Sequence, residues 1–212
     1  MKQTLKLIIK IGVLIFSIGI YAQNEKPEYD FEIIRTEIIY EHNADTTLTK
    51  LYSANKELLN GKYRIIHEDS VETFVSFKNG LWDGLYKSYY KTGELNAVIP
   101  FENGIKIGTG NWYYPNGKKK REIPYRNRQM HGKCKWYHEN GNLLKDCEYI
   151  NDKENGVCKW FYENGNIQAL ANYKNGIKNG LFEQYNENGE MIKQLYFLND
   201  KQVSKREFNK SE

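Results

Sequence analysis

The residue types that most often carry catalysis or bind metals are few and scattered in this chain. None of the four histidines stands at metal-ligand spacing from another, and they are His42, His67, His131 and His138. The chain has no His-Glu-x-x-His or Cys-x-x-Cys motif, and no glycine-rich phosphate loop leads from a strand into a helix. We therefore expect a protein that is not an enzyme, with no catalytic residues, no metal and no cofactor.

The polar residues that could suggest a site recur at regular positions. His138 stands where sister segments have tyrosine, namely Tyr90, Tyr114 and Tyr162. Glutamates beside the predicted turns keep the same step, as Glu139, Glu163 and Glu187. A side chain that recurs with a repeat is better explained by packing or by a solvated turn than by catalysis.

A period of 24 residues organises most of the chain. Two glycine series keep this step, Gly84, Gly108, Gly132, Gly156 and Gly180, and Gly93, Gly117, Gly141, Gly165 and Gly189. An asparagine series does the same, Asn103, Asn127, Asn151, Asn175 and Asn199. Two aromatic series follow, Tyr89, Tyr113, Tyr137, Phe161 and Tyr185, and Phe101, Tyr125, Tyr149, Tyr173 and Phe197. Weaker matches at Phe77 and Asn79 extend the array to about six units.

Each unit has the pattern of a β-hairpin. Strand-like runs over Lys133 to His138 and Leu143 to Ile150 flank Asn140-Gly141, which is typical of a two-residue type I′ turn. This turn sets the predicted cross-strand pairs, Gly132 with Tyr149, Cys134 with Cys147, Trp136 with Lys145, and Tyr137 with Leu144. The glycine–aromatic pair recurs in five units, and we expect the ring to cover backbone that glycine leaves bare.

Alternation along the strands divides each unit into two faces, provided that the turn has two residues. One face is apolar apart from Lys145, and in two successive units it holds Gly132, Cys134, Trp136, His138, Leu143, Lys145, Cys147, Tyr149, Cys158, Trp160, Tyr162, Ile167, Ala169, Ala171 and Tyr173. The other face is mostly polar and holds Lys135, Tyr137, Glu139, Asn142, Leu144 and Asp146.

The three cysteines all fall on the apolar face. Cys147 is predicted to lie opposite Cys134 in a closely spaced, non-hydrogen-bonded pair, and also near Cys158 in the next unit. We expect one disulfide from Cys147, with Cys134 as the preferred partner and Cys158 as the alternative. Three buried thiols that pack as small apolar groups are a second interpretation.

Two further groups are candidates for partner binding. The series Tyr89, Tyr113, Tyr137, Phe161 and Tyr185 forms a row of rings on the polar face, which suits an extended partner or serves to brace the sheet. The basic cluster Lys118, Lys119, Lys120 and Arg121 is a candidate contact with a membrane surface, or a solvated turn.

The unit resembles the MORN repeat, in the variant form found in many bacterial proteins. The resemblance rests on segments such as Trp160-Phe161-Tyr162-Glu163-Asn164-Gly165 and Tyr173-Lys174-Asn175-Gly176, and covers roughly residues 60–203. It implies an all-β fold, an elongated array of antiparallel β-hairpins in a single twisted sheet. It also implies roles in protein–protein contact, dimer formation or membrane association, with no catalytic residues. Bacterial relatives are often likened to antitoxins.

The N-terminus has the pattern of a secretory signal peptide. Lys2, Lys6 and Lys10 precede an apolar run from Ile11 to Ile20, and Ala22 suits a cleavage point. An uncleaved anchor is the alternative, although the run is short for a bilayer. Loss of three lysines lowers the formal net charge from +4 to +1, which disfavours nucleic-acid binding.

The predicted organisation is a signal peptide at 1–22, a linker and β cap at 23–59, hairpin repeats at 60–203 and a tail at 204–212. We expect an exported, non-enzymatic protein in the periplasm, at the cell surface or secreted, which binds another protein or serves as a scaffold. A membrane-surface protein and an antitoxin-like binding protein are the alternatives, and no nucleic-acid partner is expected.

Overall fold

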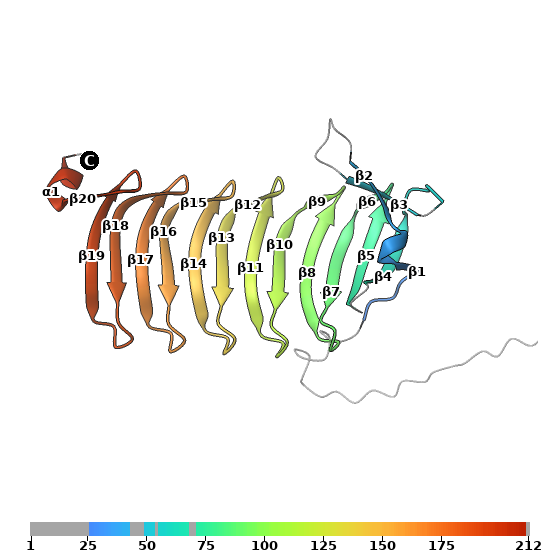
Figure 1. The fold of residues 1–212 in the computed structure, drawn as a ribbon, viewed down its shortest axis with the longest axis horizontal. Helices are drawn as coiled ribbons and strands as arrows, with labels where there is room; N and C mark the ends of the chain where they lie inside the picture. The colour runs from blue at the N-terminus through green and yellow to red at the C-terminus, as the bar shows by residue number, and fades with distance from the viewer. Residues whose placement is uncertain (1–25, 43–48, 54, 68–70, 211–212) are drawn as a thin grey trace, which may run out of the picture.

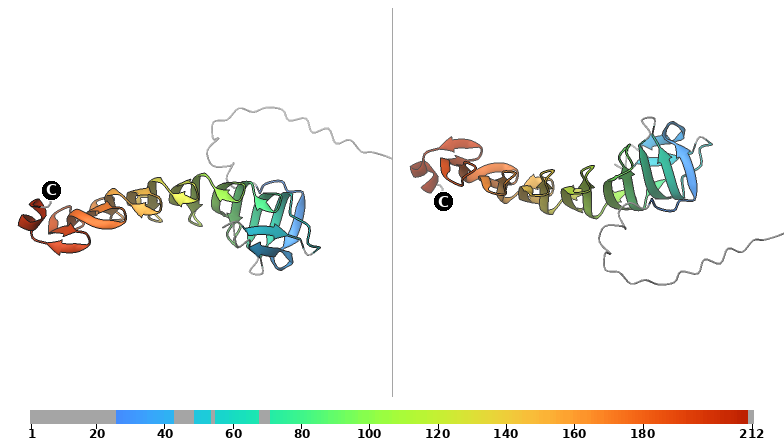
Figure 2. Two further views of the ribbon diagram at one scale, coloured as in Figure 1. Left: turned by 90° about the horizontal axis from the view of Figure 1, so that it is seen from above. Right: turned by 90° about the horizontal axis from the view of Figure 1, so that it is seen from below.

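The protein is one long open sheet of hairpins that lie side by side (Figure 1). The computed structural model describes residues 26–42, 49–53, 55–67 and 71–210. The predicted signal peptide lies outside these residues. Figure 2 shows that the sheet twists along its length. Strands run antiparallel throughout except for one parallel pair at the N-terminal end, so the predicted all-β hairpin array is confirmed.

Strands account for most of the described chain. The N-terminal elements are β1 (Phe31–Ile34), the 3₁₀ turn η2 (Arg35–Glu37), β2 (Ile39–His42) and β3 (Thr49–Tyr52). The long strands are β4 (Gly61–Ile66), β5 (Glu72–Lys78), β7 (Gly84–Tyr89), β8 (Leu95–Glu102), β10 (Gly108–Tyr113), β11 (Lys119–Arg126), β13 (Gly132–Tyr137), β14 (Leu143–Ile150), β16 (Gly156–Phe161), β17 (Ile167–Lys174), β18 (Ile177–Tyr185) and β19 (Met191–Leu198). The short elements are β6 (Leu81–Trp82), β9 (Ile105–Lys106), β12 (Gln129–Met130), β15 (Lys153–Glu154), β20 (Lys201–Val203) and helix α1 (Lys205–Asn209). No helix in this part of the chain is long and apolar enough to cross a bilayer.

Each hairpin ends in a three-residue loop rather than the predicted two-residue turn. The N–H of His138 donates to the carbonyl of Asn142 at 2.8 Å, and the N–H of Gly141 donates to His138 at 2.9 Å. Gly141 has a φ of 94°, whereas Asn140 has no positive φ. A loop of this length needs a left-handed residue only at its last position, and glycine supplies it. The predicted type I′ turn at Asn140-Gly141 is therefore wrong.

Type I′ turns do occur, but at the opposite end of the strands. Asn151 and Asp152, which join β14 to β15, have φ values of 51° and 66°. The other members of the asparagine series have the same conformation, as Asn103-Gly104, Asn127-Arg128, Asn175-Gly176 and Asn199-Asp200. Asparagine tolerates the left-handed region better than most residues, which explains why this position recurs.

A β-bulge beside each three-residue loop restores the predicted register. Tyr137 pairs with Leu143, not with Leu144, and the pairs then continue as Trp136 with Lys145, Cys134 with Cys147 and Gly132 with Tyr149. Residues directly opposite each other share a face, so Leu143 lies on the face of Tyr137. Leu144 instead lines the same groove as His138. The predicted faces of Leu143 and Leu144 are therefore exchanged, and Ile167, which pairs with Phe161, is corrected in the same way.

The predicted glycine–aromatic pairs are confirmed in all five units. The need for glycine has another cause, however. Gly132 has a φ of 110°, and a Cβ added there would lie 3.2 Å from the ring of Pro124 in the preceding strand. At Gly180 the φ is 124° and the added atom would lie 2.8 Å from Cβ of Asn172. Positive φ therefore selects glycine at all five positions, and close approach to the neighbouring hairpin adds to this at Gly132 and Gly180.

The two faces of the sheet carry different side chains. The cysteine face is the side that carries Cys134, Trp136, Lys145, Cys147 and Tyr149 and their equivalents in the other units. The tyrosine face is the opposite side, with the series Tyr89, Tyr113, Tyr137, Phe161 and Tyr185.

The N-terminal residues cover one end of the sheet in two ways. Strand β1 pairs in parallel with β4 and occupies the edge. The antiparallel pair β2–β3 forms a separate small sheet, and Leu51 of β3 and Ile38, just before β2, pack against Val75 and Phe77 of the cysteine face. The sequence predicted one strand pair that covers this end. In the structure, β1 covers the edge and the pair β2–β3 covers one face as a second layer. At the other end, Ser204 caps the short helix α1.

Candidate functional site

The predicted row of rings on the tyrosine face is partly buried. The first member, Tyr89, is only 1% exposed, and its ring meets that of Phe74 edge-on at a centroid distance of 5.5 Å. Burial raises the pKa of the Tyr89 phenol. The other four rings are half-buried, and the hydroxyl of Tyr185 donates to Glu183 at 2.9 Å. The row therefore braces the sheet at its N-terminal end and is open only in part beyond it.

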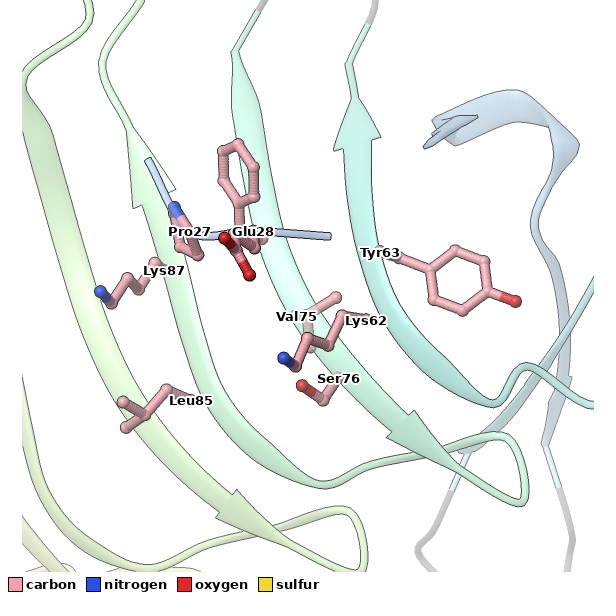
Figure 3. Close-up of a pocket in the computed structure, with 9 residues that line it drawn as sticks. Pro27, Glu28, Lys62, Tyr63, Val75, Ser76, Leu85 and Lys87 are labelled. Atoms are coloured by element: carbon pink, nitrogen blue, oxygen red, sulfur yellow. The ribbon is translucent and has the colours of Figure 1, made fainter. Parts of the chain in front are cut away.

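The tyrosine face holds an extended segment of the chain itself. Residues 26–30 cross it before β1 begins, and Figure 3 shows Pro27 and Glu28 lying over the strands. Lys26 forms an ion pair with Glu72, and the ring of Tyr29 lies 5.8 Å from that of Phe74. Pro27 and Glu28 line an open pocket of about 420 Å³ together with residues of β4, β5 and β7. A hairpin face of this protein can thus hold an extended peptide through ring and ion contacts.

The three cysteines lie together on the cysteine face, fully buried. Cys147 is bonded to Cys158, the alternative partner, and Cys134 is a free thiol. The structure therefore differs from the preferred pairing of Cys134 with Cys147. Burial raises the pKa of the Cys134 thiol to about 12, which keeps it protonated and unreactive.

The hydrogen-bond pattern explains which cysteine pairs with Cys147. The carbonyl of Glu148 accepts from the N–H of Asn155, on the side of β16. Backbone polar groups of successive residues point to opposite neighbours, so those of Cys147 point toward β13. Cys134 and Cys147 are therefore the wider, hydrogen-bonded type of pair. Cys147 and Cys158 are the closer type, with Cα atoms 4.3 Å apart.

A row of alternating tryptophans and cations crosses five adjacent strands on the cysteine face, beside the cysteines. Direct register places its members in the order Trp112, Arg121, Trp136, Lys145 and Trp160. The guanidinium of Arg121 lies 4.0 Å from the centroid of the Trp112 ring. Lys145 Nζ lies 5.1 Å from the Trp136 ring and 5.2 Å from the Trp160 ring. We call these five residues the Trp–cation row.

Lys145 is the most enclosed cation of this row. Its ammonium also lies 5.6 Å from the Tyr149 ring, 3.2 Å from the Tyr149 hydroxyl and 3.3 Å from Glu154. The Tyr149 hydroxyl donates to the same carboxylate at 2.8 Å. Burial and this carboxylate raise the pKa of Tyr149, so the phenol stays a neutral donor. Lys145, the one charged residue predicted on the apolar face, is therefore held there by aromatic rings, a hydroxyl and a carboxylate.

The sequence predictions did not single out the Trp–cation row as a site. Trp136 and Trp160 were assigned to the apolar face and Lys145 was treated as its exception. The available signal was the 24-residue step from Trp112 to Trp136 to Trp160, with Arg121 and Lys145 at the same step.

The predicted basic cluster does not form one patch. Lys119 forms a salt bridge with Glu122 at 2.9 Å, which raises the pKa of Lys119. Lys120 lies over the Tyr114 ring, and Lys118 donates to the backbone of Asn140. Arg121 belongs to the Trp–cation row. All four side chains are exposed, but each has its own contact on a different part of the unit.

His138 links neighbouring units. Its Nε2 lies 2.9 Å from the carbonyl oxygen of Phe161, and because a carbonyl only accepts, this nitrogen carries the proton. Tyrosine hydroxyls make the same contact in other units, from Tyr90 to Tyr113, Tyr114 to Tyr137 and Tyr162 to Tyr185. His138 also lines a shallow groove of about 460 Å³ with Leu144, Tyr162 and two of the turn glutamates, Glu163 and Glu187.

Comparison with known families supports the repeat assignment. No group of histidine, cysteine and carboxylate side chains among the described residues could hold a metal ion. No curated protein matches the chain. The sequence pattern of the family described as MORN repeat variant matches five consecutive segments, residues 82–103, 106–127, 130–151, 154–175 and 178–199. These segments cover just over half of the 212 residues, and the chain therefore belongs to the MORN repeat variant family.

Proposed function

We propose that the protein is a non-enzymatic interaction or scaffold module whose partner is another protein. The observation that carries the proposal is the alignment of like side chains across successive hairpins, which gives each face of the sheet continuous rows. Such rows suit an extended partner. Repeat arrays commonly present an extended binding surface of this kind. The segment at residues 26–30, held on the tyrosine face by Glu72 and Phe74, is an internal example of such binding.

Repeat arrays of this family are typically non-catalytic, which agrees with this proposal. Cys134 is the free thiol among the described residues. It is fully buried, and burial raises its pKa, so it stays protonated. The basic cluster is divided among separate contacts, so no observation favours a membrane surface over a protein partner.

Site-specific photocrosslinking tests the proposal on both faces. A photoreactive amino acid would replace Lys120 on the cysteine face or Val157 on the tyrosine face, both exposed positions. We expect a discrete protein adduct in cells of the native host from at least one position, and saturable binding when that partner is purified. Absence of an adduct from both positions at native expression would contradict the proposal.

We also propose that the protein is exported. The supporting observation is the order of lysines, apolar run and Ala22 at the N-terminus. Intact mass spectrometry of protein from the native host tests this proposal. A mature chain that begins at Gln23 in the envelope or medium is expected, and a full-length chain in the cytosol would overturn it.

A further inference from the structure

The two edges of the long sheet are covered to different extents. At the N-terminal end, β1 pairs with β4 along residues 63–66. At the C-terminal end, β20 pairs with β19 only at Tyr196, Phe197 and Leu198, and Figure 1 shows helix α1 next to β20 at the same end of the strand. Within the described chain, no strand pairs with residues 191–195 of β19 on the side away from β18. We call these five residues the open edge.

The repeat shows what normally lies beside this part of a hairpin. In each of the four preceding hairpins the second strand, β8, β11, β14 or β17, pairs antiparallel with the first strand of the next hairpin. The glycine series that ends at Gly180 would place its next member at position 204. Ser204 stands there and caps helix α1 instead of beginning a strand. The repeat therefore ends while its last strand still lacks a neighbour.

The backbone of the open edge offers unpaired hydrogen-bonding groups. In the equivalent strand β14, the carbonyl of Glu148 accepts from the N–H of Asn155, on the side of β16. Backbone groups alternate between the two sides of a strand, so those of Asp146 also point toward β16, with which it pairs. Gln194 is the equivalent of Asp146, so Gln194 and Ile192 direct their N–H and C=O groups to the open side. Such a row is a template for pairing with another chain.

The side chains of the open edge are exposed where their equivalents are covered. Met191 is 50% exposed and Ile192 is 58% exposed. The equivalent of Met191 in the hairpin β7–β8 is Leu95, which is only 8% exposed. Tyr113, from the first strand of the next hairpin, packs against the cluster that contains Leu95. Met191 therefore lacks an aromatic cover that the repeat supplies elsewhere.

The internal neighbours also indicate the side chains that fit this edge. Three first strands carry two consecutive aromatic residues, Trp112-Tyr113, Trp136-Tyr137 and Trp160-Phe161. The tryptophan lies on the cysteine face and pairs directly with a cation of the preceding strand in two cases, Trp136 with Arg121 and Trp160 with Lys145. The second ring lies on the tyrosine face.

The open edge presents the receiving side of both contacts. Lys193 is exposed and stands in the position of Arg121 and Lys145 on the cysteine face. Met191 stands in the position of Leu95, beneath the place of the second ring. The tryptophan-containing pairs of this chain already lie inside the sheet, so a second folded copy has none to offer.

We propose that the open edge binds an extended strand of another protein that carries two consecutive aromatic residues. The strand runs antiparallel to β19, with one ring beside Lys193 and the next over Met191. The backbone groups of Ile192 and Gln194 supply hydrogen bonds, as in other cases of strand addition to a sheet edge. This inference rests on the proposed function, because it assigns a site and a partner chemistry to an interaction module.

A peptide that copies an internal neighbour tests the site on the unmodified protein. The probe is a fluorescein-labelled peptide with the sequence of residues 108–114, and we expect saturable binding by fluorescence anisotropy. The same peptide with Trp112→Ala and Tyr113→Ala should bind at least about tenfold weaker, because both ring contacts are lost. A lack of binding by the first peptide, or equal affinity of the two, would overturn the proposal.

Proline substitutions test whether binding is strand addition. Asn111 of the peptide would face Gln194, as it faces Val98 in the sheet, so the peptide with Asn111→Pro lacks an N–H donor and should bind at least about tenfold weaker. In the protein, Gln194→Pro removes an N–H that faces the open side and should have the same effect, whereas the control Gln194→Thr should stay within about threefold. Circular dichroism checks the fold, and the peptide series decides the question if Gln194→Pro does not fold. Proline variants that bind as well as their controls would contradict strand addition.

Sedimentation velocity separates this partner from a second copy of the chain. We expect a monomer, and a dimer that Gln194→Pro dissociates would show that a second copy occupies the open edge, contrary to the proposal. If the peptide fails while photocrosslinking still yields a protein partner, only the inference about the edge is wrong. If crosslinking fails as well, the proposed interaction function is also wrong.

Discussion

The N-terminal cap and the central hairpins cover the same side of one sheet in different ways. In the cap, a second layer brings Leu51 and Leu59 onto Ile65, Val75 and Phe77, all of which are buried. In the centre, the buried side chains on this side of the sheet are small, such as those of Cys134 and Cys158. Half-buried rings and cations cover them in place of a second layer. A repeat array can thus be closed at one end by ordinary core packing and remain open along its length.

This difference has consequences for stability and for function. The cap buries aliphatic side chains whose removal leaves a cavity. The central units depend on smaller contributions, a disulfide, ring–cation contacts and hydrogen bonds between neighbours. Because each unit contacts mainly the next one, these contributions act locally. The open covering also leaves charged groups within reach of a partner.

The largest expected effect follows from damage to the cap. Leu59 is 1% exposed, and Leu59→Ala should cost about 3 kcal/mol, since a buried leucine truncated to alanine loses contacts and leaves a cavity. Chemical denaturation followed by circular dichroism measures the loss. Leu85→Ala is the control, because Leu85 is 52% exposed, and it should change stability by less than about 0.5 kcal/mol.

Hydrogen exchange locates the effect of Leu59→Ala. Amides of β4 and β5 should exchange faster, while those of β16 and β17 should change little. Uniform acceleration along the whole array would show that cap and centre form one cooperative unit, and the distinction between the two regions would be lost.

A second prediction concerns the disulfide of the central units. Cys158→Ser removes the bond to Cys147 and should cost about 2–3 kcal/mol under oxidising conditions, because a cross-link restricts the unfolded chain. Peptide mass spectrometry without reduction shows the bond directly. Cys134→Ala is the control, and the bond between Cys147 and Cys158 should persist in it. A bond between Cys134 and Cys147 in the native protein would contradict the structure.

The free thiol adds a pH dependence to this region. Burial raises the pKa of Cys134 to about 12 in the folded protein, above the value of about 8.5 for an exposed thiol. A raised pKa for an acid means that its stabilising contribution is complete below pH 8.5 and declines as pH rises toward 12. Cys134→Ala should flatten this decline in urea denaturation curves, and an unchanged slope would argue against burial of the thiol.

The third prediction tests the Trp–cation row as a stabilising feature. Lys145→Met removes contacts with three rings and with Glu154 and should cost about 1–2 kcal/mol. Lys159→Met on the tyrosine face is the control, since Lys159 is exposed, and should stay within about 0.5 kcal/mol. Urea denaturation followed by tryptophan fluorescence measures both. Equal effects would mean that the ring contacts of Lys145 contribute nothing beyond a surface charge.

The sequence was sufficient for the repeat, the hairpins and most of the register, but not for the turns. Asn-Gly suits both a type I′ turn and a three-residue loop with a final left-handed glycine, so the motif alone does not choose between them. The true type I′ turns include Asn127-Arg128 and Asn151-Asp152, whose second residue is not the glycine that marks this turn most clearly. The register survived because a bulge compensates for the longer loop.

The site was less predictable than the fold, for a physical reason. The choice of partner for Cys147 depends on which side of its strand the backbone hydrogen bonds leave, and a hairpin register alone does not determine this. The Trp–cation row was obscured because the position of Arg121 and Lys145 holds Ala97 one unit before and Ala169 one unit after, so the cations form no unbroken series. A periodic search finds residues that recur in every unit, whereas a cation beside the tryptophans recurs in only two successive units.

The smallest expected effects compare two tyrosine hydroxyls. The hydroxyl of Tyr162 donates to the carbonyl of Tyr185 at 2.8 Å, so Tyr162→Phe leaves that carbonyl without its donor and should cost about 1 kcal/mol. The hydroxyl of Tyr89 is buried with no hydrogen-bond partner among the described residues, and Phe161 occupies the same series without a hydroxyl. Tyr89→Phe should therefore be neutral or stabilising by up to about 1 kcal/mol.

Thermal denaturation of the two variants side by side measures this difference. Opposite directions of change would show that hydroxyls link the open central units, while at the border of the cap the ring alone is needed. If Tyr89→Phe destabilises as much as Tyr162→Phe, its hydroxyl has a partner that the described contacts do not include. The cap and the centre would then share the same kind of hydrogen bond between neighbouring hairpins, and the contrast between them would reduce to the second layer alone.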